Sequence, residues 1–290
     1  MARRWWIPLL PGSAWLVALY LVPLGLVAAA SVATPDVIGR PVYGWNLENF
    51  DQVFQPMFLP IVLKTFAFAA GATVLCLLIG YPTAYTIARF GGRFRTFLVL
   101  LVLVPWFTDY LVRIYAWVQI LGNEGLLNAL LKNLGLVNER GASLIGNSYA
   151  LLVGLTYNFL PFMIISVYVA VDRLDGRLIE AARDLHAGRF ATFRHVTLPN
   201  TIQGVAAGCQ LVFLLALGDF ATAQFLGGSQ YMLGNLIRDQ FSTAGSLPFG
   251  AALTVTLLAG LLIVAFFGRL LLRTGKGKAK GASAAEAVVA

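Results

Sequence analysis

Residues 180–199 read EAARDLHAGRFATFRHVTLP, a polar stretch that lies between two long apolar segments of the chain. The spacing of Leu178, Ala182 and Leu185 at i, i+4 and i+7 predicts a short helix over 175–185. A second helical turn or two is expected before the Leu-Pro pair that opens the next apolar segment. An otherwise apolar chain has little reason to keep such a charged projection unless another protein docks on it. The stretch therefore predicts a protein partner.

The composition indicates an integral membrane protein. The 290 residues are 59% hydrophobic and 12% charged, with a mean hydropathy of +0.78. Soluble domains carry roughly a quarter charged residues, and a membrane span needs about 20 largely apolar residues. We therefore predict an all-α integral membrane protein with six transmembrane helices, at 13–33, 59–88, 96–121, 148–171, 201–222 and 248–272.

The basic residues predict the orientation of these spans. Fifteen of the 21 Lys and Arg residues fall on one set of connecting segments and four on the other. The positive-inside rule then places both termini and the loop 172–200 in the cytoplasm. Because the basic residues are dispersed rather than grouped on one face, nucleic acid is not an expected partner, and the lipid bilayer is.

Several activities lack the motifs that they require. No G-x-x-x-x-G-K-[ST] sequence occurs, so this chain is not expected to bind ATP phosphates. Cys76 and Cys209 lie in predicted spans with no ligand-type spacing and are expected to be packing residues, so we predict no metal site. A membrane enzyme would need clustered His, Asp or Glu, whereas both histidines, His186 and His195, lie in the polar stretch. We predict no catalytic residues.

Prolines and small residues shape the predicted spans. Prolines that interrupt helices act as hinges in some transporters and are merely tolerated in static bundles, and the sequence leaves this choice open. Gly204 and Gly208 form a GxxxG pair that would allow close helix packing. The interrupting prolines are Pro23, Pro82, Pro105 and Pro161.

Ionisable residues at membrane depth are candidates for a substrate pathway, because they are costly when they face lipid. Asp109 and Arg113 are four residues apart and could form an internal ion pair or line the pathway. Asp219 has no basic residue near it in sequence. It is a candidate to attract a cationic substrate, with a structural, hydrogen-bonded role as the alternative.

Aromatic residues near these charges could bind ammonium groups through cation–π attraction. They could equally form the aromatic belt that is usual at membrane interfaces. The candidates are Trp106, Tyr110, Tyr115, Trp117 and Tyr157.

The polar stretch resembles the EAA loop of ABC-importer permeases. That pattern is EAA, three residues, Gly, nine residues, a β-branched apolar residue, any residue, then Leu-Pro, and Val196 takes the β-branched position. The family glycine would be residue 186, where this chain has His186. Either Gly188 takes over the turn or its geometry differs, and His186 is a pH-sensitive contact or a tolerated surface residue. The resemblance implies ATPase coupling by Glu180, Ala181, Ala182, Arg183, Asp184, His186, Gly188, Leu198 and Pro199.

The resemblance extends over about residues 60–270. Over this range the sequence is similar to spermidine/putrescine-type permeases in particular. Two of its motifs contain pathway candidates: Tyr110–Trp117, which reads YLVRIYAW, and Leu217–Phe220, which reads LGDF and adds Phe220 to the pathway set. Other matching runs are Pro105-Trp106, Gly125 with Asn128, Leu160–Met163, Ala181–Leu185, Leu226–Gly228 and Pro248–Ala252.

The resemblance implies a type I ABC-importer permease fold and a polyamine importer of the bacterial inner membrane. It divides the chain into an N-terminal helix and periplasmic loop (1–58), a permease core (59–272) and a disordered cytoplasmic tail (273–290). The implied partners are a cytoplasmic ATPase dimer that holds ATP and Mg²⁺, a second homologous permease that makes a heterodimer, and a periplasmic substrate-binding protein. The alternatives are another small solute, or a secondary transporter that works without an ATPase and would show inverted repeats and no docking loop.

Overall fold

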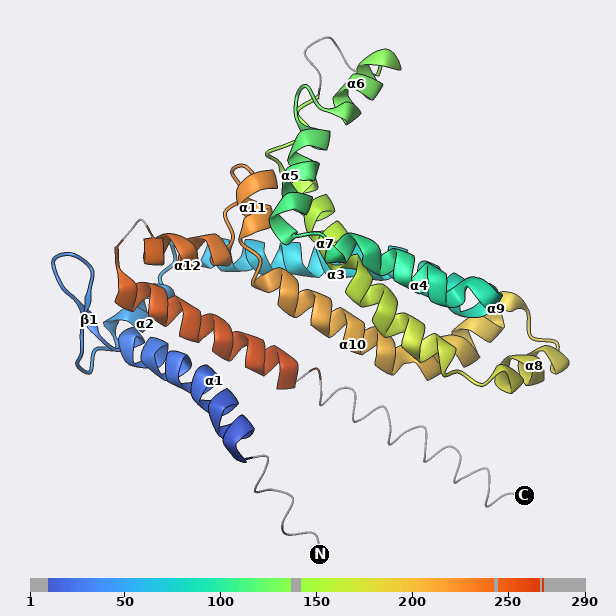
Figure 1. The fold of residues 1–290 in the computed structure, drawn as a ribbon, viewed down its shortest axis with the longest axis horizontal. Coiled ribbons are helices and arrows are strands. Elements are labelled where there is room, and N and C mark those ends of the chain that lie inside the picture. Colours follow the sequence, from blue (N-terminus) through green and yellow to red (C-terminus); the bar gives the residue numbers. More distant parts are fainter. Residues whose placement is uncertain (1–9, 137–141, 243–244, 267, 269–290) are drawn as a thin grey trace, which may run out of the picture. The chain divides into compact units, whose positions relative to one another are not determined.

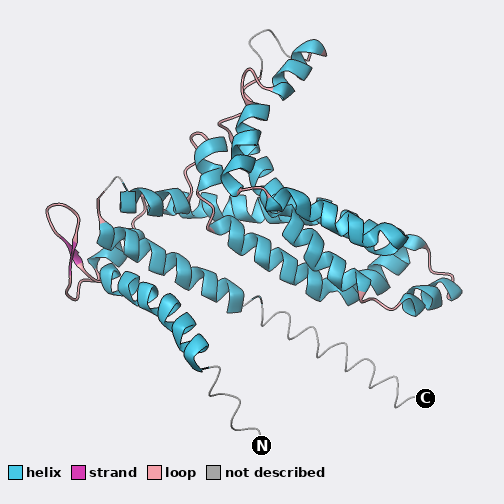
Figure 2. Cartoon of the chain, in the orientation of Figure 1, coloured by secondary structure: helices cyan, strands magenta, loops and turns pink. Residues whose placement is uncertain are grey.

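A computed structural model of the chain describes residues 10–136, 142–242, 245–266 and 268. These residues are mostly helical (Figure 2), because helices satisfy their own backbone hydrogen bonds in a lipid environment. One short strand pair is present among them, with β1 (Thr34–Pro35) antiparallel to β2 (Pro41–Val42). The predicted tail 273–290 and the last residues of the sixth predicted span lie outside the described residues.

Five of the described helices are long and apolar enough to cross a membrane, and a bent pair supplies a sixth span if it is counted as one. The five cover Gly12–Ser31, Leu59–Phe90, Ser148–Asp172, Arg189–Leu217 and Leu247–Phe266. They agree with five of the six predicted spans.

The third predicted span, 96–121, is not one straight helix, which corrects that prediction. The helices Gly92–Phe107 and Tyr110–Asn133 meet at 87°. Pro105 lies in a 3₁₀ turn just before the bend, and Thr108 is extended, with φ −74° and ψ 142°. Asp109 then caps the next helix, since its side chain accepts from the first-turn N–H groups.

The chain divides into two compact units, which we describe separately. One comprises residues 1–60 and 236–263. Within it, Asn49 ties α2 to the end of α1 by donating to the carbonyls of Ser31 (3.0 Å) and Ala33 (2.8 Å). Its helices are α1 (Leu10–Ser31), α2 (Glu48–Val53) and most of Leu247–Phe266.

The larger unit comprises residues 61–235 and 264–290, and α7 (Ser148–Asp172) packs along α10 (Leu198–Leu217) within it (Figure 1). The predicted close approach at the GxxxG pair is confirmed. A Cβ at Gly208 would lie 2.9 Å from the Met163 sulfur, and a Cβ at Gly204 would overlap Ala170. The remaining helical elements of this unit are α3 (Leu59–Phe90), η1 (Gly92–Phe94), α4 (Arg95–Leu103), η2 (Val104–Phe107), α5 (Tyr110–Leu121), α6 (Leu126–Asn133), α8 (Gly176–Asp184), α9 (Arg189–Thr192), η3 (Phe193–Thr197) and α11 (Ala221–Leu226). Most of α12 (Leu233–Ser242) belongs to the smaller unit.

Candidate functional site

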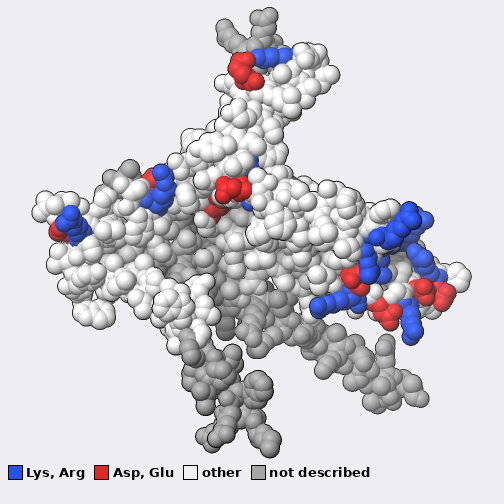
Figure 3. All heavy atoms as spheres, viewed as in Figure 1, with Lys and Arg blue, Asp and Glu red and all other residues white. Residues whose placement is uncertain are grey.

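The polar stretch folds as predicted at its start. Helix α8 begins at Gly176, and Asp175 caps it by accepting from the Arg177 N–H over 3.0 Å. Charged side chains gather around α8 and α9, at the right of Figure 3. This end of the larger unit therefore presents a charged surface in this view.

The surface of α8 is open in the way that a docking element requires. Glu180 is exposed and makes no ion pair with any described residue. Leu185 is 83% exposed and Phe190 is 75% exposed, whereas Ala182 is buried. The predicted apolar face is thus divided, because Ala182 packs inward while Leu185 projects outward. Unpaired charge beside exposed apolar groups is typical of a surface that a partner covers.

His186 occupies the position of the expected glycine and adopts its conformation. Its φ is +58°, and it is the only described non-glycine residue with a positive φ. The His186 N–H donates to the Arg183 carbonyl (2.8 Å), and the Ala187 N–H donates to the Ala182 carbonyl (3.0 Å). These two bonds form a Schellman motif, in which the residue after the helix is left-handed. Gly188 does not take over the turn, since its φ is −64°.

The second part of the stretch forms the expected one or two helical turns, but these turns do not end before Leu198-Pro199. Helix α9 continues through the π-helical turn η3 directly into α10, so this segment belongs to a 29-residue helix. The physical reason is Pro199, whose ring and missing N–H disturb the regular α-helical hydrogen bonding of the preceding turn. A wider π turn absorbs that disturbance without ending the helix.

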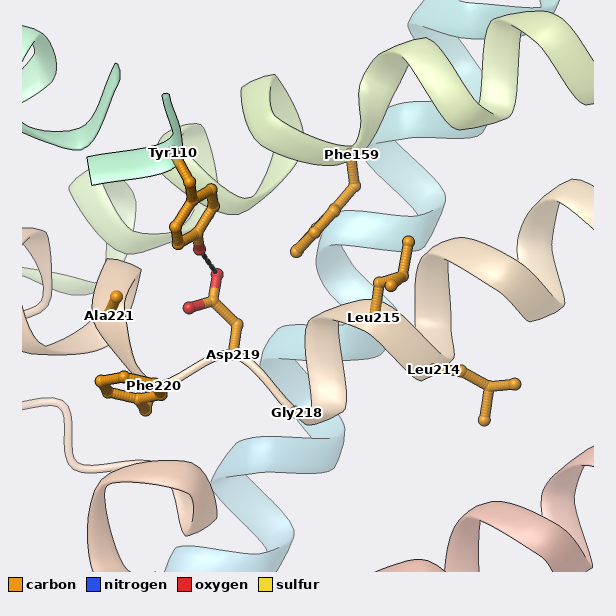
Figure 4. Close-up of a pocket in the computed structure, with 8 residues that line it drawn as sticks. All are labelled: Tyr110, Phe159, Leu214, Leu215, Gly218, Asp219, Phe220 and Ala221. Carbon is orange, nitrogen blue, oxygen red and sulfur yellow. Dashed lines mark hydrogen bonds between the residues drawn. The ribbon is translucent and has the colours of Figure 1, made fainter. Parts of the chain in front are cut away.

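A hollow of about 360 Å³ lies where α10 ends. Its lining combines one carboxylate with aromatic and aliphatic groups, and its size is in the range of small-molecule sites. In Figure 4, the Tyr110 hydroxyl points at the Asp219 carboxylate, and Phe159 extends from α7 beside them. The lining residues are Tyr110, Phe159, Leu214, Leu215, Gly218, Asp219, Phe220 and Ala221.

Asp219 is the centre of a hydrogen-bonded network. It is 7% exposed and accepts from the Tyr110 hydroxyl (2.6 Å), the Thr222 hydroxyl (2.5 Å) and the Thr222 N–H (3.0 Å). Asn158 Nδ2 donates to the same Thr222 hydroxyl over 3.2 Å. Among the described residues no Lys or Arg forms an ion pair with Asp219. The carboxylate is therefore held rigidly, with no cation of its own.

The suggested ion pair between Asp109 and Arg113 does not form. Asp109 uses its carboxylate to cap α5, accepting from the N–H groups of Leu111 (2.9 Å) and Val112 (3.4 Å). Arg113 is 8% exposed, and its Cζ lies 5.6 Å from the ring centroid of Tyr110. Its Nε has no hydrogen-bond partner among the described residues. Arg113 thus lies against one lining residue of the hollow without lining it.

The other aromatic candidates make ring contacts and do not line this hollow. Ring centroids are 5.5 Å apart for Trp106 and Phe162, 5.0 Å for Tyr115 and Phe225, and 5.3 Å for Trp117 and Tyr157. Of the nine pathway candidates, the structure brings three to the hollow: Tyr110, Asp219 and Phe220.

Sequence reasoning missed the polar residues that support Asp219. Thr222 is fully buried and Asn158 is 2% exposed, and neither was a site candidate. An uncharged polar residue inside a predicted span is a usable signal, because it needs a hydrogen-bond partner there. Asn158 carries that signal, while Thr222 is recognisable only from its position three residues after Asp219.

Comparison with known proteins identifies relatives over most of the chain. Residues 77–274 match the family described as "Binding-protein-dependent transport system inner membrane component". The chain is 38% identical over 256 residues to the spermidine/putrescine transport system permease protein PotB of Haemophilus influenzae (87% of this chain, 89% of that one). It is 34% identical over 256 residues to PotB of Escherichia coli K12 (87% and 93%).

A solved structure shares the fold. A chain of a bacterial ABC transporter involved in the import of the acidic polysaccharide alginate superposes with a TM-score of 0.68 at 17% identity. The match covers 93% of this chain and 94% of that one. This likeness confirms the predicted all-α membrane fold.

Proposed function

Since this chain belongs to the binding-protein-dependent transport system inner membrane components, we propose that it is the permease subunit of an ATP-driven polyamine importer. It is a multi-pass protein of the inner membrane, and its proposed orientation has both termini in the cytoplasm. The PotB relatives named for spermidine and putrescine support the proposed substrate class. The chain's own residues must then bind and pass a flexible polycation.

The observation that carries this proposal is the unpaired carboxylate in the hollow. A buried charge without a counter-ion is costly, and a bound ammonium group would supply the missing charge. Tyr110 and Thr222 hold Asp219 in place, so the carboxylate loses little freedom when a substrate binds. The rings of Phe159 and Phe220 line the same space and offer apolar and cation–π contact to the substrate.

The proposed partners follow from the opposite end of the larger unit. A cytoplasmic ATPase dimer docks on α8, where Glu180, Leu185 and Phe190 are exposed. A second, homologous permease completes the pathway, and a periplasmic binding protein delivers the substrate. ATP and Mg²⁺ are held by the ATPase, so this chain is a transport subunit rather than an enzyme.

The proposed cycle is alternating access. ATP-driven closure of the ATPase pair moves α8, and the helices attached to it rock the pathway from an outward to an inward opening. Asp219 holds an ammonium group in the hollow while this occurs. Release follows when the surrounding groups separate and water replaces their contacts with the substrate.

A different small solute is the alternative, because family membership alone does not fix the substrate. The test is uptake by proteoliposomes that contain the ATPase, both permeases and the binding protein. ATP-dependent accumulation of labelled spermidine or putrescine, competed by neither neutral nor anionic solutes, is the expected result. Uptake of an uncharged or anionic solute in place of the polyamines would overturn the proposed substrate class and leave the permease role intact.

A further inference from the structure

The guanidinium of Arg89 connects helix α3 to the residues just before α8. Arg89, in the last turn of α3, donates from Nη2 to the carbonyl of Leu174 over 3.0 Å. Leu174 is buried and directly precedes Asp175, the residue that caps α8. The base of α8 is thus hydrogen-bonded to α3 as well as being covalently joined to α7.

The same helix also contacts η3 and the beginning of α10, after α9. The Tyr81 hydroxyl lies 3.1 Å from the Thr201 hydroxyl, in a buried position at the beginning of α10. The Tyr81 ring packs edge-on against Phe193 of η3, with ring centroids 5.5 Å apart. Helix α3 therefore contacts residues on both sides of the segment that carries α8 and α9.

The other end of α3 reaches the residues behind the hollow. The Leu233 N–H donates to the Thr65 hydroxyl over 2.9 Å, and Thr65 is fully buried. Two residues later, Asn235 Nδ2 donates to the Phe220 carbonyl over 2.9 Å. Between them, a Cβ at Gly234 would lie 3.0 Å from the Phe220 Cβ, so the segment 233–235 packs directly on a wall of the hollow.

We infer that α3 links the segment that carries α8 and α9 to the wall of the hollow, with Arg89 and Thr65 as positioning residues at its two ends. Helix α10 carries Asp219 by direct chain connection, whereas α3 holds the 233–235 segment that supports Phe220. Thr65 and Arg89 are 24 residues apart in this one continuous helix, which contains Pro82, so the two contacts lie about 36 Å apart along its axis. Motion of α8 would then shift Phe220 relative to Asp219. This inference goes beyond the proposed function and needs only an ATP-driven partner, whatever the solute.

The first test measures the segment that contacts α3 at Thr65 and uses no solute. Hydrogen exchange is measured in peptides that contain Leu233, in the assembled transporter without nucleotide and with ATP and vanadate. The expected result is at least a threefold change in exchange rate between these states, lost in Arg89→Gln and kept in Arg89→Lys. The matched control is Arg93→Gln, because Arg93 is exposed and its guanidinium lies over the ring of its neighbour Phe94. An unchanged rate in the parent protein, or a full response in Arg89→Gln, would overturn the inference.

The second test addresses Thr65 and does not depend on the first. Thr65→Val removes the acceptor of the Leu233 N–H, whereas Thr65→Ser keeps it. Thr73→Val is the control, since the Thr73 hydroxyl makes the same own-helix bond to a carbonyl four residues earlier as Thr65 does, with no second partner among the described residues. In the assembled and still monodisperse transporter, Thr65→Val is expected to at least triple the ATP hydrolysed per solute imported. A ratio equal to that of Thr73→Val would contradict a positioning role. If the parent transporter takes up no polyamine, the proposed substrate is wrong. The exchange experiment still tests the inference in that case, because it uses no solute.

Discussion

The Tyr110 hydroxyl donates to the Asp219 carboxylate over 2.6 Å and joins residues 109 positions apart in the sequence. Tyr110 is the first residue of α5, directly after the 87° bend. Asp219 lies in the short break between α10 and α11. Two interruptions of regular helix therefore meet at this hydrogen bond, and both supply groups to the hollow.

Tyr110→Phe removes this hydroxyl and keeps the ring. Hydrogen bonds to charged groups contribute about 1.5–3 kcal/mol, so we expect weaker solute uptake at low concentration and a lower unfolding temperature of the assembled transporter. Tyr149→Phe is the control, because Tyr149 is 80% exposed and its hydroxyl makes no hydrogen bond with any described residue. Equal behaviour of the two variants would show that the Tyr110 hydroxyl contributes nothing to the site.

Asp219→Asn keeps the shape of the side chain and removes its charge. If Asp219 binds an ammonium group, the KM for polyamine uptake should rise at least tenfold, equivalent to about 1.4 kcal/mol. The effect should exceed that of Tyr110→Phe, since that variant retains the carboxylate and both Thr222 donors. Initial uptake rates over a range of spermidine concentrations measure it.

Glu124→Gln is the matched control for Asp219→Asn. Glu124 is exposed in the connection between α5 and α6, so its change removes one negative charge without touching the hollow. Its KM should equal that of the parent protein. A KM for Asp219→Asn that matches this control would assign Asp219 to a structural role, in which its bonds to Thr222 and Tyr110 only fix the start of α11.

Local sequence signals predicted the spans well because membrane helices depend on hydropathy summed over about 20 residues. The bend at Thr108 and Asp109 was not predicted, since it depends on one extended residue and one capping side chain within an apolar run. Asp219 was recognised as unusual from its charge alone. Its partner Tyr110 could not be assigned from the sequence, because nothing local relates two residues so far apart.

The polar stretch was likewise predicted only in part. Its first helix was predicted from apolar spacing, and the cap Asp175 is a standard start signal. The continuation of α9 into α10 was missed, because Pro199 also reads as the first turn of a new helix. Only the backbone shows that the π turn η3 carries the helix past it.

Glu180→Lys reverses the charge of the exposed acidic residue on α8. We expect ATP-driven uptake to be abolished while membrane insertion is unchanged, because a reversed charge opposes docking of a complementary partner surface. Co-purification of the ATPase with the permease measures the loss directly. Glu124→Lys makes the same charge change in the connection between α5 and α6, outside α8, and should keep both assembly and uptake. Full uptake by Glu180→Lys would contradict the coupling role of this loop.

His186→Gly tests the turn that ends α8. A non-glycine residue in the left-handed conformation costs roughly 1–2 kcal/mol, so glycine should stabilise the Schellman motif by about 1 kcal/mol, while the β-branched His186→Val should destabilise it. Hydrogen exchange of the residue 186 and Ala187 N–H groups, which close the motif, measures this locally. An increase in protection of about fivefold is expected for glycine and a decrease for valine. If His186→Gly leaves protection unchanged but lowers the affinity of the ATPase, the imidazole contacts the partner, and the left-handed turn is kept for that contact.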